Sequence, residues 1–195
     1  MDFKKAYDSV DMGYLDMVMG RMCFSTLWLN WIKECVTMTT ASMLVNGSPT
    51  DEFPLERSLR QGDPLSPFLF LLAAEGLNIM MKAMVESTIF SGYSIVSENP
   101  VVLSNLQFAD DTLILGAKSW VNVRALWAVI VLFKDVSGLK VNFHKNLFVG
   151  VNISNSWLIE AASIFTCKMG KVSFLYLWIV GWWKPAQVVV LGVCW

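Results

Sequence analysis

Two adjacent aspartates interrupt an apolar stretch in the middle of the chain, "NLQFADDTLILG". Leu106 and Phe108 lead into Asp110 and Asp111, and apolar residues follow at once. Burying two unpaired carboxylates among apolar side chains is costly, whereas Asp is a favoured turn residue because its side chain bonds nearby backbone N–H groups. The pattern therefore predicts a hairpin over residues 103–115, with the pair at or beside its turn.

The segments before this hairpin alternate helical and strand patterns. Apolar spacing over residues 12–38 predicts two short helices, separated at about residues 20–25. Asn46-Gly47 predicts a tight turn between two strands. The loop "LRQGDPLSP" is expected to lead into a helix over about residues 66–85, because Pro67 suits a first helical turn.

The segments after the hairpin continue the alternation. Ser119 is a candidate N-cap for a helix that ends near Ser137, and Gly138 is a candidate residue just past its end. The further expected elements are a strand near 146–151, a short helix near 156–166 and a strand near 173–178. This mixture predicts an α+β fold in which helices cover one face of an antiparallel sheet.

The composition raises the question of a membrane protein. Of 195 residues, 55% are hydrophobic and 16% are charged, and the mean hydropathy is +0.50. A spanning helix needs about 20 apolar residues, and most apolar runs are shorter. The exception is "VSFLYLWIVGWWKPAQVVVLGVCW", where glycines, a Lys-Pro pair and many Val and Trp residues disfavour a helix. We expect strands or a disordered apolar tail there, with membrane association through the tail as an alternative.

Charge and cysteine usage exclude little. The net charge is −1, so the overall basic excess that often marks a nucleic-acid binder is missing. The four cysteines have neither metal-site spacing nor disulfide-scaffold density, and we expect buried small side chains. No cationic leader followed by an apolar core is visible, so we expect an intracellular protein of the nucleus or cytoplasm.

The Asp pair has two interpretations at this point. It can be simple turn chemistry, or it can be part of a divalent-metal site, because hard cations take oxygen ligands and neutralise clustered carboxylates. If a second strand brought Asp2 alongside, the set could hold two metals about 3.5–4 Å apart, which suits phosphoryl transfer. Spacing alone does not decide between them.

Four motifs in order resemble a known family. They are "MDFKKAYDSV", "LRQGDPLSPFLFLLAAEGL", "LQFADDTLILG" and "SGLKVNFHKN". Together they resemble the reverse transcriptase palm of plant LINE-type, non-LTR retrotransposons, from residue 2 to about 177. The resemblance implies a palm-like antiparallel sheet with helices packed on one face, and we expect fingers and thumb to be missing. Residues 1–177 would form the partial palm domain, and 178–195 a divergent apolar tail outside the family fold.

The resemblance assigns the carboxylates. Asp2, Asp110 and Asp111 match the catalytic, metal-binding residues, and the Phe3 carbonyl matches an assisting backbone ligand. The implied cofactor is a pair of Mg²⁺ ions, with Mn²⁺ as an alternative, and no organic cofactor. The implied partners are an RNA template, a DNA primer and a dNTP, and a membrane is not expected.

Further matches concern the substrate. Tyr7 matches the steric gate that disfavours a ribose 2′-OH, although an aromatic residue there also suits packing. Gln61 and Gly62 match the loop beside the incoming nucleotide and template, and Arg60 could add a contact. Lys145 matches the lysine that protonates the leaving pyrophosphate. The primer-grip match is Phe174, Leu175, Tyr176 and Leu177.

The sequence departs from the family pattern at three places. Met1 stands directly before Asp2, Ser58 replaces a usual glycine, and Trp178 follows where glycine is expected. These departures leave open a remnant that keeps the motifs but does not catalyse. A metal-dependent hydrolase is disfavoured, because Tyr7 and the Gln-Gly loop would then have no role.

Overall fold

The computed structural model describes residues 3–37, 40–54, 59–95, 101–108, 111–170 and 188–193. In this part of the chain the helices are α1 Ala6–Ser9, α2 Met12–Arg21, α3 Thr26–Thr37, α4 Ser66–Glu86, α5 Trp120–Ser137 and α6 Asn155–Ile164. The strands are β1 Phe3–Lys4, β2 Thr40–Ala41, β3 Leu44–Val45, β4 Ser48–Pro49, β5 Phe53–Pro54, β6 Tyr93–Ile95, β7 Val101–Leu103, β8 Asn105–Phe108, β9 Asp111–Ala117, β10 Lys140–Val141, β11 Asn146–Val151, β12 Lys168–Met169 and β13 Val188–Val193.

The largest sheet has five strands in the order β12-β11-β13-β9-β8. Its neighbours pair antiparallel except β11 and β12, which run parallel. The parallel pair follows from the connection, because α6 crosses between β11 and β12 and a parallel pair needs such a crossover. Helices mixed with small antiparallel sheets confirm the expected α+β class.

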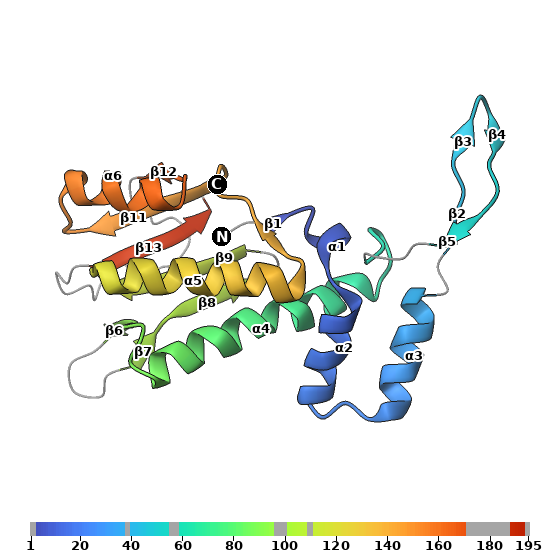
Figure 1. Ribbon diagram of the computed structural model, residues 1–195, viewed down its shortest axis with the longest axis horizontal. Coiled ribbons are helices and arrows are strands. Elements are labelled where there is room, and N and C mark those ends of the chain that lie inside the picture. The colour runs from blue at the N-terminus through green and yellow to red at the C-terminus, as the bar shows by residue number, and fades with distance from the viewer. Residues whose placement is uncertain are drawn as a thin grey trace.

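Helix α5 packs against one face of this sheet (Figure 1). Val123 and Leu126 of α5 line the same small cavity as Ile114, Phe148 and Leu191 of three adjacent strands, and all five residues are buried. Helix α4 contacts both α2 and α5. A second, smaller cluster joins Leu115 of β9 to Tyr93 of β6. The main core therefore lies between the sheet and helices α2, α4 and α5.

Local signals placed most boundaries correctly. Asn46 and Gly47 form the β3–β4 turn with φ of 52° and 83°, as a primed turn requires. The Ser119 hydroxyl accepts a hydrogen bond from the Val121 amide at 3.1 Å. Gly138 ends α5 with φ of 77°, a conformation that favours glycine. These helix and turn predictions are confirmed.

Other expectations met a different outcome. Cys23 and Cys35 are exposed, so the prediction of buried cysteines is wrong for them, while Cys167 is partly buried. Cys35 shares an apolar but exposed stripe of α3 with Leu27 and Trp31, whereas α3 buries Ile32 instead, and Cys23 lies in the turn after α2. The strand expected near 173–178 lies outside the described residues. Within the expected tail, residues 188–193 form β13, between β9 and β11.

One described helix is long and apolar enough to cross a membrane. It is α4, with a mean hydropathy of 1.6. Its Phe70, Ala73, Leu77 and Met81 are buried in the main core. The core helix of a protein without any membrane segment has the same length and composition, so these properties alone are weak evidence for a span.

Candidate active site at one end of the sheet

The expected hairpin is present, and Asp111 stands at its rim. Asp111 is the first residue of β9 and pairs with Phe108 of β8, and Gln107 pairs with Thr112. The Asp111 residue is half-buried. Asp110 lies outside the described residues. The hairpin prediction is confirmed, and one of its two carboxylates is placed at the end of the sheet.

Polar side chains tie this hairpin to α4. Asn78 Nδ2 donates to Glu75 Oε2 at 2.7 Å and to Gln107 Oε1 at 3.0 Å. Asn105 Nδ2 donates to Asn78 Oδ1. Asn105 and Gln107 alternate along β8, so both reach the same helix. The network fixes β8 on α4 close to the point where Phe108 pairs with Asp111.

Three strands end or begin at the same place beside Asp111. Asn146, the first residue of β11, pairs with Val193, the last residue of β13. Leu191 of β13 pairs with Ile114 of β9. Because neighbouring strands are about 4.8 Å apart, the starts of β9 and β11 lie roughly 10 Å apart at one end of the sheet, with the end of β13 between them.

Lys145 stands at this end of the sheet. It directly precedes Asn146, and its amide donates to the Asn142 carbonyl at 3.0 Å in the turn that joins β10 to β11. The Lys145 side chain is exposed. The structure therefore brings Lys145 and Asp111, two residues of distant motifs, to the same end of the sheet.

The strand that follows Asp2 is placed by its aromatic side chain. Phe3 is 5% exposed, and its ring centroid lies 6.1 Å from that of Phe70 and 6.2 Å from that of Phe133. Strand β1 pairs with β10, Phe3 opposite Val141, and among the described strands it has no other partner. Strand β10 leads into the turn that carries Lys145, so β1 lies near that turn. Asp2 itself lies outside the described residues.

Tyr7 and the expected substrate loop are in direct contact. The Leu59 amide donates to the Tyr7 carbonyl at 2.9 Å, which places Arg60 and Gln61 beside α1. The Tyr7 ring packs 5.3 Å from the Phe70 ring. Arg60 and Gln61 are exposed, and Gly62 has φ of 90°, which a residue with a Cβ adopts only at a cost.

Asp111 is the one expected metal-binding carboxylate among the residues that the structure describes. Among the residues that the structure describes, no three His, Cys, Asp or Glu side chains come together, but two of the three expected carboxylates fall outside them. Asp111 supplies the oxygen donors that Mg²⁺ prefers, at a half-buried position. Burial raises the pKa of Tyr14 to about 12 and that of Cys167 to about 11; neither belongs to the expected site.

Several site predictions stay untested. Phe174, Leu175, Tyr176 and Leu177, expected as a primer grip, lie outside the described residues. Conversely, the sequence interpretation missed Asn78 and its partners on β8. The available signal was a polar residue in the apolar run "EGLNIM" together with alternating polar residues in "NLQF".

Comparison with known proteins shows which family the chain resembles. A family model described as reverse transcriptase (RNA-dependent DNA polymerase) matches residues 1–193. The chain is 29% identical over 166 residues to a retrovirus-related Pol polyprotein from type-1 retrotransposable element R2 of Popillia japonica, a match that covers 85% of this chain and 22% of that protein. It is 26% identical over 146 residues to the transposon TX1 uncharacterized 149 kDa protein of Xenopus laevis, covering 75% of this chain and 11% of that protein.

A shorter relative comes from a plant. An uncharacterized mitochondrial protein of Arabidopsis thaliana is 37% identical over 90 residues, covering 46% of this chain and 70% of that protein. The chain spans about a fifth of the R2 polyprotein and about a tenth of the TX1 protein. Because the family model matches nearly the whole length, the chain belongs to the reverse transcriptase (RNA-dependent DNA polymerase) family.

Proposed function

We propose that this chain is the palm of an RNA-directed DNA polymerase of the LINE, non-LTR type. It would transfer a nucleotide from a dNTP to the 3′-OH of a DNA primer paired with an RNA template. The proposal rests on one observation: Asp111 and Lys145 lie at the same end of the sheet. The β1–β10 ladder, which follows Asp2, leads into the turn that carries Lys145. The match to a protein of Arabidopsis thaliana supports the part of the proposal that assigns the chain to a plant element.

The carboxylates would hold the metal ions. Asp2, Asp110 and Asp111, with the Phe3 carbonyl, are the proposed ligands of two Mg²⁺ or Mn²⁺ ions. Such ions, when bound, lower the pKa of the attacking hydroxyl and stabilise the leaving oxygens. The half-buried position of Asp111 at a strand end supports this role, because a paired strand holds the carboxylate while one side stays open to substrate.

The remaining residues would position the substrate. The Tyr7 ring, backed by Phe70, would contact the sugar and exclude a ribose 2′-OH. Gln61 and Gly62 would lie along the nucleotide and template, and Arg60 would contact phosphate. Lys145 would donate its Nζ proton to the pyrophosphate oxygen that leaves, a general-acid role for which an exposed ammonium at the open end of the sheet is suited.

Further parts of the machinery belong to the same proposal. Phe174–Leu177 would hold the primer end. The fingers and thumb of the family are expected in the parts of longer relatives that this chain does not match, and the activity of a whole polymerase is therefore a proposal for this chain.

Primer extension tests this function. The purified chain is given an RNA template with an annealed DNA primer, Mg²⁺ and dNTPs. We expect extension that Asp111→Asn abolishes and that Lys145→Ala slows by roughly 10²-fold or more, the usual size of a general-acid contribution. The matched control is Asp16→Asn, which removes one exposed carboxylate on α2 and should leave extension unchanged.

The same assay can overturn the proposal. A folded wild-type chain that extends no primer would favour the inert remnant. Extension that survives Asp111→Asn would remove Asp111 from the metal site. Addition of ribonucleotides by Tyr7→Val but not by Tyr7→Phe would support the steric gate separately, because only the first variant opens space at the sugar.

A further inference from the structure

Two lysines face each other across the β1–β10 ladder. Lys4 pairs with Lys140, directly beside the pair Phe3 and Val141. Phe3 and Val141 are 5% and 6% exposed and point into the core. Because successive side chains in a strand point to opposite faces, Lys4 and Lys140 point outward together, and both are exposed.

This arrangement works against stability. Like charges directly opposite on neighbouring strands destabilise a sheet. Neither lysine forms an ion pair with any residue that the structure describes, whereas Lys82 pairs with Glu86 and Lys134 with Asp135. The repulsion between Lys4 and Lys140 is therefore not offset by a carboxylate in the described part of the chain.

The ladder cannot slip to separate the two charges, because its flanks are fixed. The Ser9 hydroxyl donates to the Lys4 carbonyl at 3.1 Å. A Cβ on Gly138 would lie 2.2 Å from the Ser9 carbonyl oxygen, so the turn before β10 sits directly on the end of α1. These contacts hold the register of β1 against β10 from both sides.

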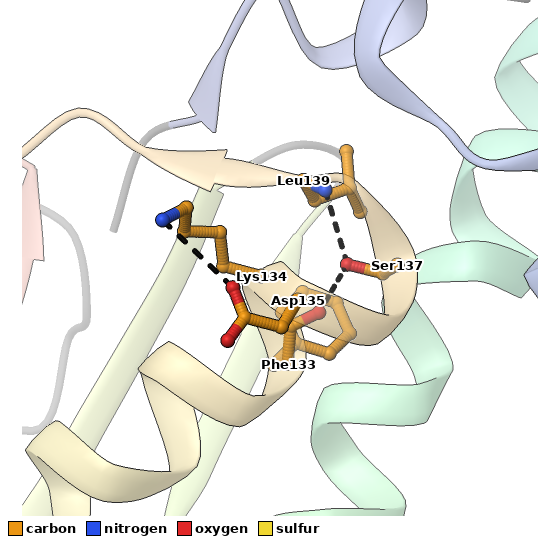
Figure 2. Close-up of polar contacts among 5 residues, drawn as sticks. All are labelled: Phe133, Lys134, Asp135, Ser137 and Leu139. Atoms are coloured by element: carbon orange, nitrogen blue, oxygen red, sulfur yellow. Dashed lines mark hydrogen bonds and ion pairs between the residues drawn. The ribbon is translucent and has the colours of Figure 1, made fainter.

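The turn before β10 is also fixed internally (Figure 2). The buried Ser137 hydroxyl donates to the Phe133 carbonyl at 2.6 Å and accepts from the Leu139 amide at 3.1 Å. The same view shows the ion pair between Lys134 and Asp135. Lys140 therefore starts from a rigid turn, and its charge is held opposite Lys4.

The neighbouring exposed side chains add positive charge. Lys5 follows Lys4, and Lys145 lies in the turn after β10; both are exposed. Among the described residues, the exposed carboxylates near them in the sequence are Asp8 on α1 and Asp135, which is paired with Lys134; Asp2, two residues before Lys4, lies outside the described residues. A chain with a net charge of −1 thus concentrates basic residues at the β1–β10 ladder.

We propose that Lys4 and Lys140 bind the phosphates of a nucleic-acid backbone. An exposed pair gains little from a single solvated anion, whereas a polymer with closely spaced phosphates releases counterions at each contact. The inference rests on the proposed function for its substrate, since Lys4 follows Asp2 by two residues and Lys140 pairs with it, but it requires only binding and no nucleotide transfer.

Salt-dependent binding tests the pair. Fluorescence anisotropy with a labelled RNA–DNA duplex of mixed sequence is measured for the full chain between about 50 and 200 mM salt. We expect Lys4→Ala/Lys140→Ala to bind more weakly and to lower the slope of log K against log salt by about two, since each contact contributes about 0.9. Lys4→Arg/Lys140→Arg should bind as the wild type does.

The control Lys82→Ala/Lys168→Ala removes the same charge from exposed sites on α4 and β12. It should keep the slope of log K against log salt.

Three outcomes of the salt titration would overturn the proposal. They are an unchanged slope in Lys4→Ala/Lys140→Ala, an equal loss in the Lys82/Lys168 control, and no measurable duplex binding by the wild-type chain. Inorganic tripolyphosphate is the competitor that separates the sources of phosphate. If Lys4→Ala/Lys140→Ala weakens the binding of tripolyphosphate but leaves the binding of the duplex unchanged, the pair binds a free triphosphate and the backbone assignment is wrong.

A stability measurement separates binding from folding. Relief of repulsion predicts that Lys4→Ala/Lys140→Ala unfolds at the same or a higher denaturant concentration than the wild type, while binding the duplex more weakly. A loss of both stability and binding would assign the two lysines a structural role. Retained binding by Asp111→Asn, which should extend no primer, would distinguish a failure of catalysis from a failure of this inference.

Discussion

The two strands that carry the expected metal ligands are held in different ways. Strand β9 has seven residues and pairs with β8 on one side and β13 on the other. Strand β1 has two residues and one described partner, β10. Most of the order at β9 comes from backbone hydrogen bonds, whereas β1 depends on the Phe3 ring between Phe70 and Phe133.

The difference shows where the site is sensitive. A long strand inside a sheet tolerates the loss of one side-chain contact, because its ladder remains. A two-residue strand has little ladder to lose, so one aromatic residue and one turn decide its position. Variants at Phe3, Gly138 and Asn78 should separate these two kinds of support.

The largest effect is expected for Phe3→Ala. It removes a buried ring that contacts two helices, and such truncations cost about 3–5 kcal/mol. Urea unfolding measures the change in the free energy of unfolding. Phe68→Ala, the same change at a residue of α4 that is 47% exposed, should cost about 0.5 kcal/mol or less. Equal costs for the two variants would mean that the backbone ladder, and not Phe3, holds β1.

The next effect is expected for Gly138→Ala. The residue has φ of 77°, and the new Cβ would meet the Ser9 carbonyl oxygen at 2.2 Å, so we expect a loss of about 2–3 kcal/mol. The control is Gly20→Ala in α2, where a Cβ meets nothing within 4 Å and helix propensity predicts a gain of up to about 1 kcal/mol. If Gly138→Ala left the free energy of unfolding unchanged, the turn before β10 would be able to move away from α1.

A smaller effect is expected at the β9 hairpin. Asn78→Ala breaks the side-chain tie between α4 and β8 but leaves the β8–β9 ladder, so we expect a cost of about 1–2 kcal/mol. Asn155→Ala, at an exposed residue of α6, serves as the matched control. Hydrogen exchange should show that the β9 amides are still protected in Asn78→Ala. If they lost their protection, β9 would depend on side-chain contacts with α4, as β1 does through Phe3 and Phe70.

The smallest effect concerns α4, which supports both strands. The Tyr14 hydroxyl donates to the Ala73 carbonyl at 2.9 Å, and burial raises the Tyr14 pKa from 10.0 to about 12. The unfolded state therefore loses this proton first, and the free energy of unfolding should fall as the pH rises from about 10 to about 12. Tyr14→Phe should remove this part of the fall and cost about 1 kcal/mol at neutral pH.

This pH dependence is measured by urea unfolding at successive pH values in a Cys167→Ala background. The background is needed because burial also raises the Cys167 pKa, from 9.0 to about 11, which adds a fall of the same sign. An identical pH slope with and without Tyr14→Phe would contradict the assignment.

Much of the local structure was predictable from single residues. The Ser119 cap, the Gly138 end of α5, the Asn46-Gly47 turn and Pro67 in the first turn of α4 each act within a few residues. Such signals depend on the backbone preference of one residue and its near neighbours, so the chain carries them whatever the rest of the fold does.

The site was predictable only as a set of motifs. Their order identified the family, and the hairpin around Asp111 followed from two carboxylates in an apolar run. Neither the tie from Asn78 to Gln107 nor the contact between Leu59 and Tyr7 has a local signal. These contacts join residues that are 29 and 52 positions apart, and spacing in the sequence does not encode such a distance.

By itself the sequence determined the helices, the turns and the chemical character of the candidate site. Only the tertiary structure decided which strands became neighbours: β13 lies between β9 and β11, and β1 pairs with β10 so that Lys4 faces Lys140. The physical reason is that a strand offers the same backbone groups to any partner. Its neighbour is chosen by the side chains that the whole fold can bury, such as Phe3, Val141 and Leu191.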